Sequence, residues 1–213
     1  MGEVARAVAA RVIPLLPSEG LSRMLEAVRV TPGELPMKTV VALSVALFLS
    51  VAAFADDVEV GGMKSTPPKG WKEEPPANSM RLTQFKLSKA EGDDEDAELA
   101  VFHFKGGSGG VEANLERQVK KFKPTAGKDK VEAKVEKTKV GKIDATYQDV
   151  TGVFLSKFPP FAPNAKITEK KDYRQLYVIF TTEGGDYYMT LLGPAKTIEK
   201  HKKDFDSFLA NFK

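Results

Sequence analysis

The chain has 213 residues, in which 32 Lys and Arg stand against 29 Asp and Glu, for a formal net charge of +3. The two signs are interspersed along most of the chain, so the charge gives no indication of nucleic-acid binding, and we expect no nucleic acid among the partners. Cysteine is absent, which excludes disulfides, thiol catalysis and thiolate metal sites.

The N-terminal quarter contains the pattern of an export signal. Residues 37–55, MKTVVALSVALFLSVAAFA, place Lys38 before a largely apolar run and small residues at Ala53 and Ala55, which is typical of a secretory signal peptide. We predict cleavage after Ala55 and a periplasmic or secreted protein. Residues 1–36 form a prefix that signal peptides usually lack, and we interpret it as untranslated, with translation starting at Met37.

A signal anchor over residues 39–55 is the alternative. This stretch is just long enough to span a bilayer, and the arginines ahead of it favour a cytoplasmic N-terminus. The domain would then lie outside the cytoplasm, held to a membrane by that segment alone.

Residues 56–76 are rich in proline and glycine and show little periodicity, so we predict a flexible arm that leads into one domain over residues 77–213. Trp71, the only tryptophan, is expected to bury its ring against the edge of a sheet, because a large aromatic side chain contributes most when buried.

Alternation of apolar and polar residues then predicts strands. Residues 80–87 change face midway, and residues 98–104 are apolar on both faces. Residues 131–140 and the stretch from 143 onward form a hairpin that turns at Gly141. Two runs that are apolar on both faces, 173–182 and 186–193, flank the turn signal EGG.

Two segments have helical spacing. In residues 111–122, the apolar side chains Val111, Leu115, Val119 and Phe122 form one stripe of an amphipathic helix. Residues 196–212 form a long final helix. Strands that are apolar on both faces need cover on both sides, so we predict an α/β (α+β) fold, an antiparallel β-sheet of about six strands sandwiched between helices.

The stretches EDAELAVFHFKGGSGGVEANLERQVKKF and DYRQLYVIFTTEGGDYYMTLLGPAKTIEKHKKDFDSFL, together with the signal peptide, resemble an uncharacterised exported bacterial protein family with a PsbP-like fold. The resemblance covers the chain from about Trp71 to its end. It implies the fold, and it implies an accessory protein that binds another protein. The long insertion of such relatives is represented here by the short KFPPFAPNAK.

The glycine-rich turn FHFKGGSGGVEANLER lies between a predicted strand and a predicted helix. A phosphate loop needs a lysine and a hydroxyl at the helix start, where this chain has Glu112, and the dinucleotide spacing is also unmet. We therefore interpret it as a tight turn. Backbone amides at Gly107, Ser108, Gly109 and Gly110 remain a weak candidate site for a small anion.

No other pattern indicates a metal or catalytic site. The acidic stretch 91–98 lacks the spacing of an EF-hand loop, and we read it as a solvated turn, with a loosely bound cation as the alternative. His103 is expected to be a hydrogen-bonded core residue and His201 to lie on the exposed side of the final helix. No nucleophile, base and orienting acid can be chosen from spacing, so we expect no cofactor and no enzyme activity.

The stretch FPPFAP combines aromatic residues with prolines, and such segments can dock into a partner protein; a stiff connector is the alternative. Its candidate partner-binding residues are Phe158, Pro159, Pro160, Phe161 and Pro163. The function predicted from the sequence is an exported noncatalytic binding or accessory module that contacts an envelope or extracellular protein. A small-ligand or cation-binding protein and an enzyme with a non-local active site are the alternatives.

Overall fold

A computed structural model describes residues 56–106, 109–160 and 162–213 of the protein. All of these residues fall within the same compact unit. The prefix 1–36 and the signal peptide or anchor expected over 37–55 lie outside the described residues.

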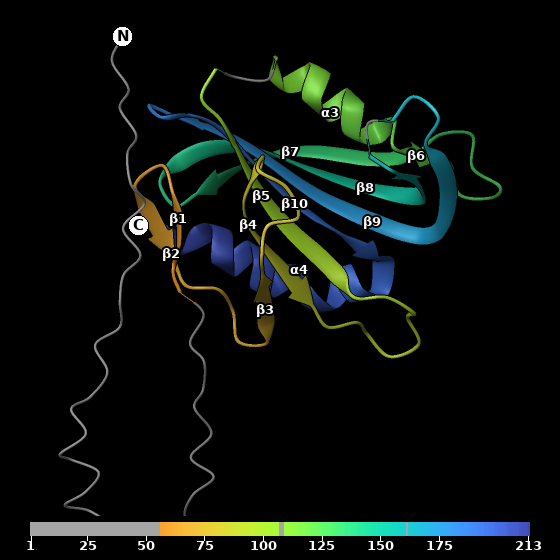
Figure 1. Ribbon diagram of the computed structural model, residues 1–213, viewed down its shortest axis with the longest axis horizontal. Coiled ribbons are helices and arrows are strands. Elements are labelled where there is room, and N and C mark those ends of the chain that lie inside the picture. Colours follow the sequence, from red (N-terminus) through yellow and green to blue (C-terminus); the bar gives the residue numbers. More distant parts are fainter. Residues whose placement is uncertain (1–55, 107–108, 161) are drawn as a thin grey trace, which may run out of the picture. The chain divides into compact units, whose positions relative to one another are not determined.

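The described elements are strands and helices in the following chain order (Figure 1). They are β1 (Val58–Val60), β2 (Met63–Ser65), β3 (Trp71–Glu74), β4 (Arg81–Leu87), β5 (Ala97–Phe104), α3 (Val111–Val119), β6 (Phe122–Lys123), β7 (Glu132–Val140), β8 (Ile143–Phe158), β9 (Lys166–Thr182), β10 (Gly185–Pro194) and α4 (Ala195–Ala210).

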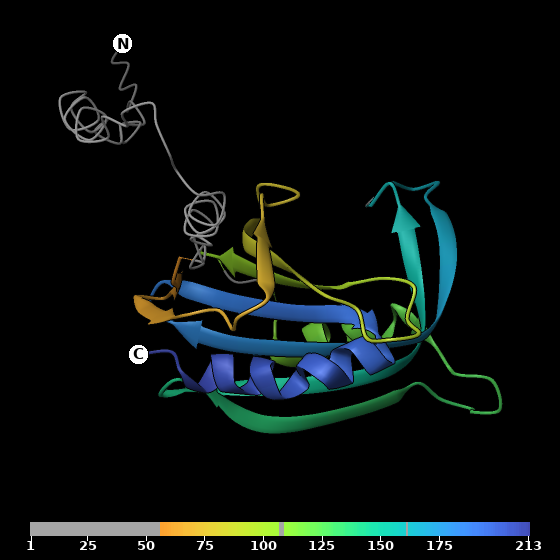
Figure 2. The same cartoon turned by 90° about the horizontal axis from the view of Figure 1, so that it is seen from below.

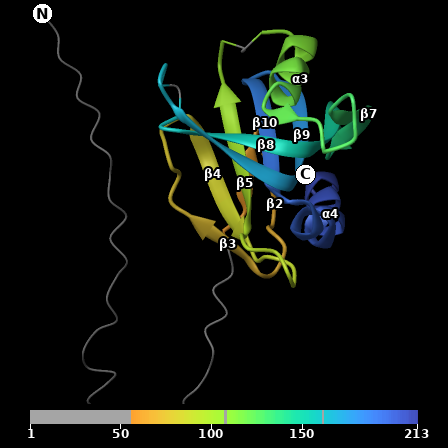
Figure 3. The same ribbon diagram turned by 90° about the vertical axis from the view of Figure 1, so that its right-hand side faces the viewer.

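Within the described residues, eight strands form one sheet in the order β3-β4-β5-β10-β9-β8-β6, with β7 also paired to β8. Every pairing in it is antiparallel, as predicted. The two strands beyond the predicted six are the short β3 and β6. In the end view of Figure 3, β8 and β9 run across the direction of β4 and β5, which is the twist expected of a large sheet.

Helix α4 covers one face of this sheet. Alternate residues of a strand point to opposite faces, and along β9 Leu176, Val178 and Phe180 belong to the same buried cluster as Ile198 and Phe205 of α4. This cluster is the main hydrophobic core.

Helix α3 lies on the opposite face and covers it less completely. Its Leu115 packs, half-buried, with Tyr177 and Ile179, the residues of β9 that point away from α4. The sheet thus has one helix on each face among the described elements, but strands dominate the fold.

The orientation of α3 corrects the predicted apolar stripe. The buried residues of the helix are Asn114 and Gln118, while Val111 is 42% exposed. Phe122 lies in β6 and not in the helix, because the chain leaves the helix after Val119 and turns to pair with β8. Phe122 is therefore not part of the helix, and α3 faces the sheet with the polar residues Asn114 and Gln118.

The segment 56–76, expected to be a flexible arm, instead contributes β1, β2 and β3 to the fold. Val58 and Val60 are buried in the main core. Backbone hydrogen bonds join Lys64 and Lys213 in both directions, at 2.9 and 3.1 Å. The short strands escape a periodicity search because each has only three or four residues, too few to show a repeat, and because β2 is also fixed by the C-terminal residue Lys213.

Trp71 is buried in the edge strand β3, as predicted. Its ring packs on Phe85 at 6.0 Å and on Phe208 of α4 at 5.3 Å between centroids. The sheet edge and the helix are therefore joined through one aromatic cluster.

Three local predictions about strand shape also agree with the structure. Strand β4 changes register between Arg81 and Thr83, which explains the change of face within residues 80–87. The β7–β8 hairpin turns at Gly141, and the β9–β10 hairpin turns between Thr182 and Gly185.

Neither α3 nor α4, the helices of the described residues, combines the length and apolar character needed to cross a bilayer.

Candidate functional site

The candidate site is the hairpin arm, residues 155–169, formed by the end of β8, the start of β9 and the loop between them. Among the described residues, β7 pairs with β8 only as far as Thr151, and β6 pairs with it at Val153 and Phe154. Beyond this point the two strands of the arm pair with each other alone. Figure 2 shows this cyan and light-blue hairpin standing away from the rest of the sheet.

The arm bends away from the sheet at Gly152. The register between β8 and β9 shifts between Gly152 and Phe154, and a Cβ atom at Gly152 would lie 2.5 Å from the carbonyl oxygen of Lys123. Only glycine therefore permits the close approach of β6 at this bend. On the facing strand, Asp172 has a positive φ of 53°, a conformation that Asp adopts more readily than most residues.

Aromatic side chains hold the base of the arm. The ring of Phe154 stacks on Tyr173 at 5.8 Å and contacts Phe122 at 5.3 Å between centroids. The backbone N–H of Leu155 donates a hydrogen bond of 2.8 Å to the carbonyl of Lys121. The arm consequently leaves the domain in a defined direction.

Glu95, in the acidic loop, adds a charged anchor. Its carboxylate accepts hydrogen bonds from the ammonium of Lys170 and, at 2.8 Å, from the hydroxyl of Tyr173. Lys170 chiefly, with help from Tyr173, holds the pKa of Glu95 below its usual value. A second ion pair joins Lys123 to Glu169.

The tip of the arm exposes large apolar side chains. Phe158 is 74% exposed and Ile167 is 52% exposed. Phe158 pairs with Lys166 and Lys157 pairs with Ile167, so the two apolar side chains point to opposite faces of the arm. Each face of the tip therefore combines one apolar residue with one lysine.

The loop at the tip begins with a cis peptide bond between Phe158 and Pro159. The carbonyl of Pro159 accepts a hydrogen bond of 3.4 Å from Ala162, and Pro160 and Pro163 are exposed. The structure thus gathers the predicted residues Phe158, Pro159, Pro160 and Pro163 at one end of the molecule, whereas Phe161 lies outside the described residues. Their role in binding stays a prediction.

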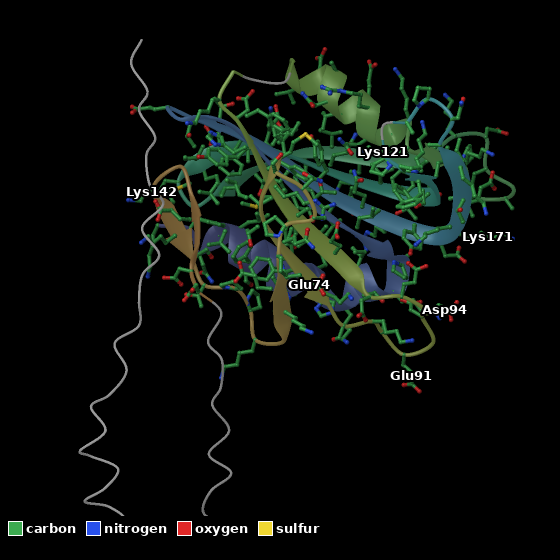
Figure 4. All side chains as sticks on the ribbon, viewed as in Figure 1. Glu74, Glu91, Asp94, Lys121, Lys142 and Lys171 are labelled. Atoms are coloured by element: carbon green, nitrogen blue, oxygen red, sulfur yellow. The ribbon has the colours of Figure 1, made fainter. Side chains whose placement is uncertain are left out.

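The sequence did not single out Ile167 or the lysines beside it. Lys157 and Lys166 are exposed at the tip of the arm, and Lys171 is exposed just beyond the arm, at its base (Figure 4). The available signal was the alternation of lysine with apolar residues on both sides of the proline loop, which becomes a surface only when the two strands pair.

The glycine turn places its carbonyl groups against α3. Gly109 has a positive φ of 94°, and Gly110 precedes the first residue of the helix without a side-chain cap. The Asn114 side chain donates hydrogen bonds to the carbonyls of Gly109 and Gly110, at 3.2 and 3.0 Å. These contacts fit the interpretation as a turn. Gly107 and Ser108 lie outside the described residues, so the weak anion site stays a prediction.

The acidic loop 91–98 uses its carboxylates to hold other parts of the chain. Asp93 accepts hydrogen bonds from the backbone N–H and the hydroxyl of Thr197, at 2.9 and 2.6 Å, in the first turn of α4. Asp96 accepts one from the backbone of Lys89. Figure 4 shows Glu91 and Asp94 extending from the same loop. Among the described residues, no cluster of acidic and histidine side chains is arranged to hold a metal ion.

His103 is half-buried and His201 is buried, so one of the two expectations about the histidines needs correction. His103 is half-buried, bonds the carbonyl of Gly184 at 2.8 Å and stacks on Tyr187 at 4.3 Å, so its hydrogen bond is confirmed. His201 is 7% exposed and bonds the carbonyl of Ser88 at 2.8 Å. The expectation that His201 faces solvent is wrong, because the loop after β4 covers that side of α4.

Comparisons with known proteins give one kind of match. No protein-family model and no curated protein matches this chain. Among solved structures, it is similar to cyanobacterial PsbP (CyanoP) from Synechocystis sp. PCC 6803, with a TM-score of 0.44 and 12% sequence identity, over 77% of this chain and 95% of that chain.

Proposed function

We propose that the described domain is an exported, noncatalytic binding module that contacts a protein partner through the tip of the hairpin arm. The observation that carries this proposal is the exposure of Phe158 and Ile167 on a hairpin that leaves the sheet. Exposed apolar surface rimmed by polar residues can mark a protein–protein interaction site, and Phe is enriched in such interfaces. Export is inferred from the signal sequence over 37–55.

The charges on the arm and at its base indicate the chemistry of the partner. Lys157, Lys166 and Lys171 are exposed, and none of them takes part in an ion pair among the described residues. An apolar tip flanked by lysines complements an apolar pocket with an acidic rim. Such a rim would accelerate association through electrostatic attraction.

A pair of variants tests the proposal. Phe158→Ser combined with Ile167→Ser removes the apolar tip, and Val135→Ser is the matched control, because Val135 is 50% exposed on the edge strand β7. Each protein is immobilised and exposed to the envelope fraction of the producing cells. We expect one envelope protein to bind the wild type and the control with equal affinity, and to bind the double variant at least about tenfold more weakly.

Two results would contradict the proposal. Equal recovery of the partner by the double variant would show that the arm is not the contact surface. Binding of the wild type to anionic phospholipid vesicles, lost in the double variant and with no protein recovered, would assign the tip to a membrane surface.

A further inference from the structure

A cleft lies between α3 and the sheet face that α3 covers incompletely. Its volume is about 380 Å³, within the range of roughly 300 to 1,000 Å³ that is typical of small-molecule sites. Side chains from β4, β5, β8, β9 and β10 and from α3 line it. The hairpin arm contributes nothing to the lining beyond its base, so the cleft is a separate feature of the domain.

The walls of the cleft are largely aromatic. Phe102 and Phe104 of β5 are half-buried and pack in one cluster with Tyr177 and Tyr188. Tyr177 and Tyr188 stack at 6.1 Å with an angle of 23° between the rings, and Phe104 meets Tyr188 edge-on at 5.6 Å. Partly exposed rings on the wall of a cleft offer a surface for a flat apolar ligand.

The same cleft contains a buried side-chain oxygen atom, Oε1 of Gln175, that has no hydrogen-bond partner among the described residues. Gln175 of β9 is 0% exposed, and its Nε2 donates a hydrogen bond of 3.2 Å to Oε1 of Gln118. Its own Oε1 has no hydrogen-bond partner among the described residues. An unsatisfied buried acceptor costs free energy, which a ligand N–H would recover.

The charge of the cleft is positive. Its lining includes Arg81, Arg117 and Lys121, and the carboxylate among the lining residues, Glu98, is paired with Arg81 at 2.8 Å. Lys121 donates a hydrogen bond of 2.6 Å to Oε1 of Gln118, the same atom that accepts from Gln175. Oε1 of Gln118 thereby holds both the ammonium group of Lys121 and the side-chain amide of Gln175, whose own Oε1 has no hydrogen-bond partner among the described residues.

Lys121 is exposed over much of its surface, yet the atoms around its ammonium group remove much of its water. This desolvation, and secondarily the positive charge of Arg117, lower the pKa of Lys121 below its usual value. Among the described residues, no ion pair includes Lys121. A bound anion would offset both the desolvation and the repulsion from Arg117.

We propose that this cleft binds a small aromatic anion that carries an N–H group. The flat ring would lie against Phe102, Phe104 and Tyr188. The anionic group would pair with Lys121 and Arg117, and the N–H would donate to Oε1 of Gln175. Ligand binding in this cleft is independent of partner binding by the hairpin arm. The proposed ligand lies beneath the polar side of α3 and not at the glycine turn.

Three related probes test the proposed ligand chemistry by isothermal titration calorimetry with the purified full-length protein. Indole-3-acetate has the ring, the carboxylate and the N–H. Indole-3-ethanol lacks the carboxylate, and 1-methylindole-3-acetate lacks the N–H. We expect saturable binding of indole-3-acetate and about tenfold weaker binding of each analogue, which corresponds to about 1.4 kcal/mol. Equal affinities for the three probes, or no saturable binding of indole-3-acetate, would overturn the proposal.

Variants then locate the binding. Lys121→Met should weaken binding of indole-3-acetate about tenfold and leave the affinity for indole-3-ethanol unchanged. Gln175→Leu should weaken binding of indole-3-acetate and leave 1-methylindole-3-acetate unaffected. Lys142→Met is the matched control, since Lys142 lies at the opposite end of the domain from Lys121 (Figure 4) and is exposed.

Thermal unfolding of each variant, followed by circular dichroism, shows whether it is folded at the temperature of the titration. If Gln175→Leu is not folded, the comparison of Lys121→Met with Lys142→Met decides alone. An equal loss of affinity in these two lysine variants, or no loss in Lys121→Met, would overturn the assignment to the cleft.

Discussion

Gln118 of α3 and Gln175 of β9 are joined by a hydrogen bond of 3.2 Å between their side-chain amides. This contact lies where an amphipathic helix usually presents apolar side chains to a sheet. On the other face, α4 buries Phe205 and Phe208 against the sheet, each 1% exposed or less. Helix α4 is therefore held by a buried apolar side, whereas α3 combines buried polar contacts with only the half-buried Leu115 and Val119.

This difference predicts unequal local stability. The amides of α3 should exchange with deuterium faster than those of α4, because few apolar contacts oppose the opening of α3. Hydrogen exchange measured by NMR in native conditions checks this expectation. Equal protection of the two helices would show that the polar contacts hold α3 as firmly as the main core holds α4.

The core side of α4 should be sensitive to truncation. Phe208→Ala removes a buried ring that contacts both Trp71 and Phe212, and we expect it to lower the free energy of unfolding by about 3 to 5 kcal/mol. Phe158→Ala, at the exposed tip of the arm, should change it by less than about 0.5 kcal/mol. Urea unfolding followed by the fluorescence of Trp71 measures both. Similar losses in the two variants would mean that the tip is packed against the domain.

Alanine substitutions at two glycines distinguish the cost of a left-handed backbone conformation from the cost of a steric clash. Gly127 has a φ of +81° and open space around it, whereas Gly141 has a φ of +57° and a Cβ there would lie 2.2 Å from the carbonyl oxygen of Phe212. Gly127→Ala should cost about 1 to 2 kcal/mol through the left-handed conformation alone. Gly141→Ala should cost about 1 to 3 kcal/mol more, since the C-terminal segment must also move.

Urea unfolding of both alanine variants gives these differences directly. In Gly141→Ala we also expect loss of the hydrogen bond of 2.8 Å from the backbone of Gly141 to Leu209, visible as faster exchange of the Gly141 amide. If Gly141→Ala is no less stable than Gly127→Ala, the C-terminal segment is not fixed against the β7–β8 turn.

Glu95 should give the base of the arm a dependence on pH. The pKa of Glu95 is held below its ordinary value of 4.5 by Lys170 and Tyr173. The ionised carboxylate therefore stabilises the folded state above that value, and the contribution is lost as the pH falls through the folded-state pKa. The effect is small, because the Glu95 side chain is 52% exposed and water screens the ion pair.

NMR titration of the Glu95 carboxyl carbon checks this prediction. Tyr173→Phe removes one hydrogen bond and should raise the pKa of Glu95 toward 4.5. Ser207→Ala, near the C-terminal end of α4 and therefore away from the first turn that this loop contacts, should leave it unchanged. A Glu95 pKa at or above 4.5 in the unaltered protein would show that the anchor does not form in solution.

Much of the sheet was predictable because its signals are local. The short apolar runs over residues 98–104 and 173–182, the alternation within residues 131–140 and the glycines of the hairpin turns determine strands and turns without reference to distant residues. Trp71 was placed correctly for a similar reason: a single large aromatic residue at a sheet edge gains most by being buried.

The features that the sequence did not predict depend on contacts between distant segments. Strands β1 and β2 are stabilised by the C-terminal residues, and His201 is covered by the backbone of Ser88, 113 residues away in sequence. The inward side of α3 was missed because Asn114 and Gln118 have the same spacing as a buried stripe, but their polarity suggests a solvated side. Only the position of Gln175 beneath them reveals a polar cleft.

The most direct test of the proposed function is photocrosslinking from the tip of the arm in living cells. A p-benzoylphenylalanine residue replaces Phe158 in one variant and Val135 in the control, both of which are exposed. We predict that position 158 gives a crosslink to one envelope protein and that position 135 gives none to it. Crosslinks from position 158 to lipid alone, or the same protein captured equally from both positions, would contradict partner binding through the hairpin arm.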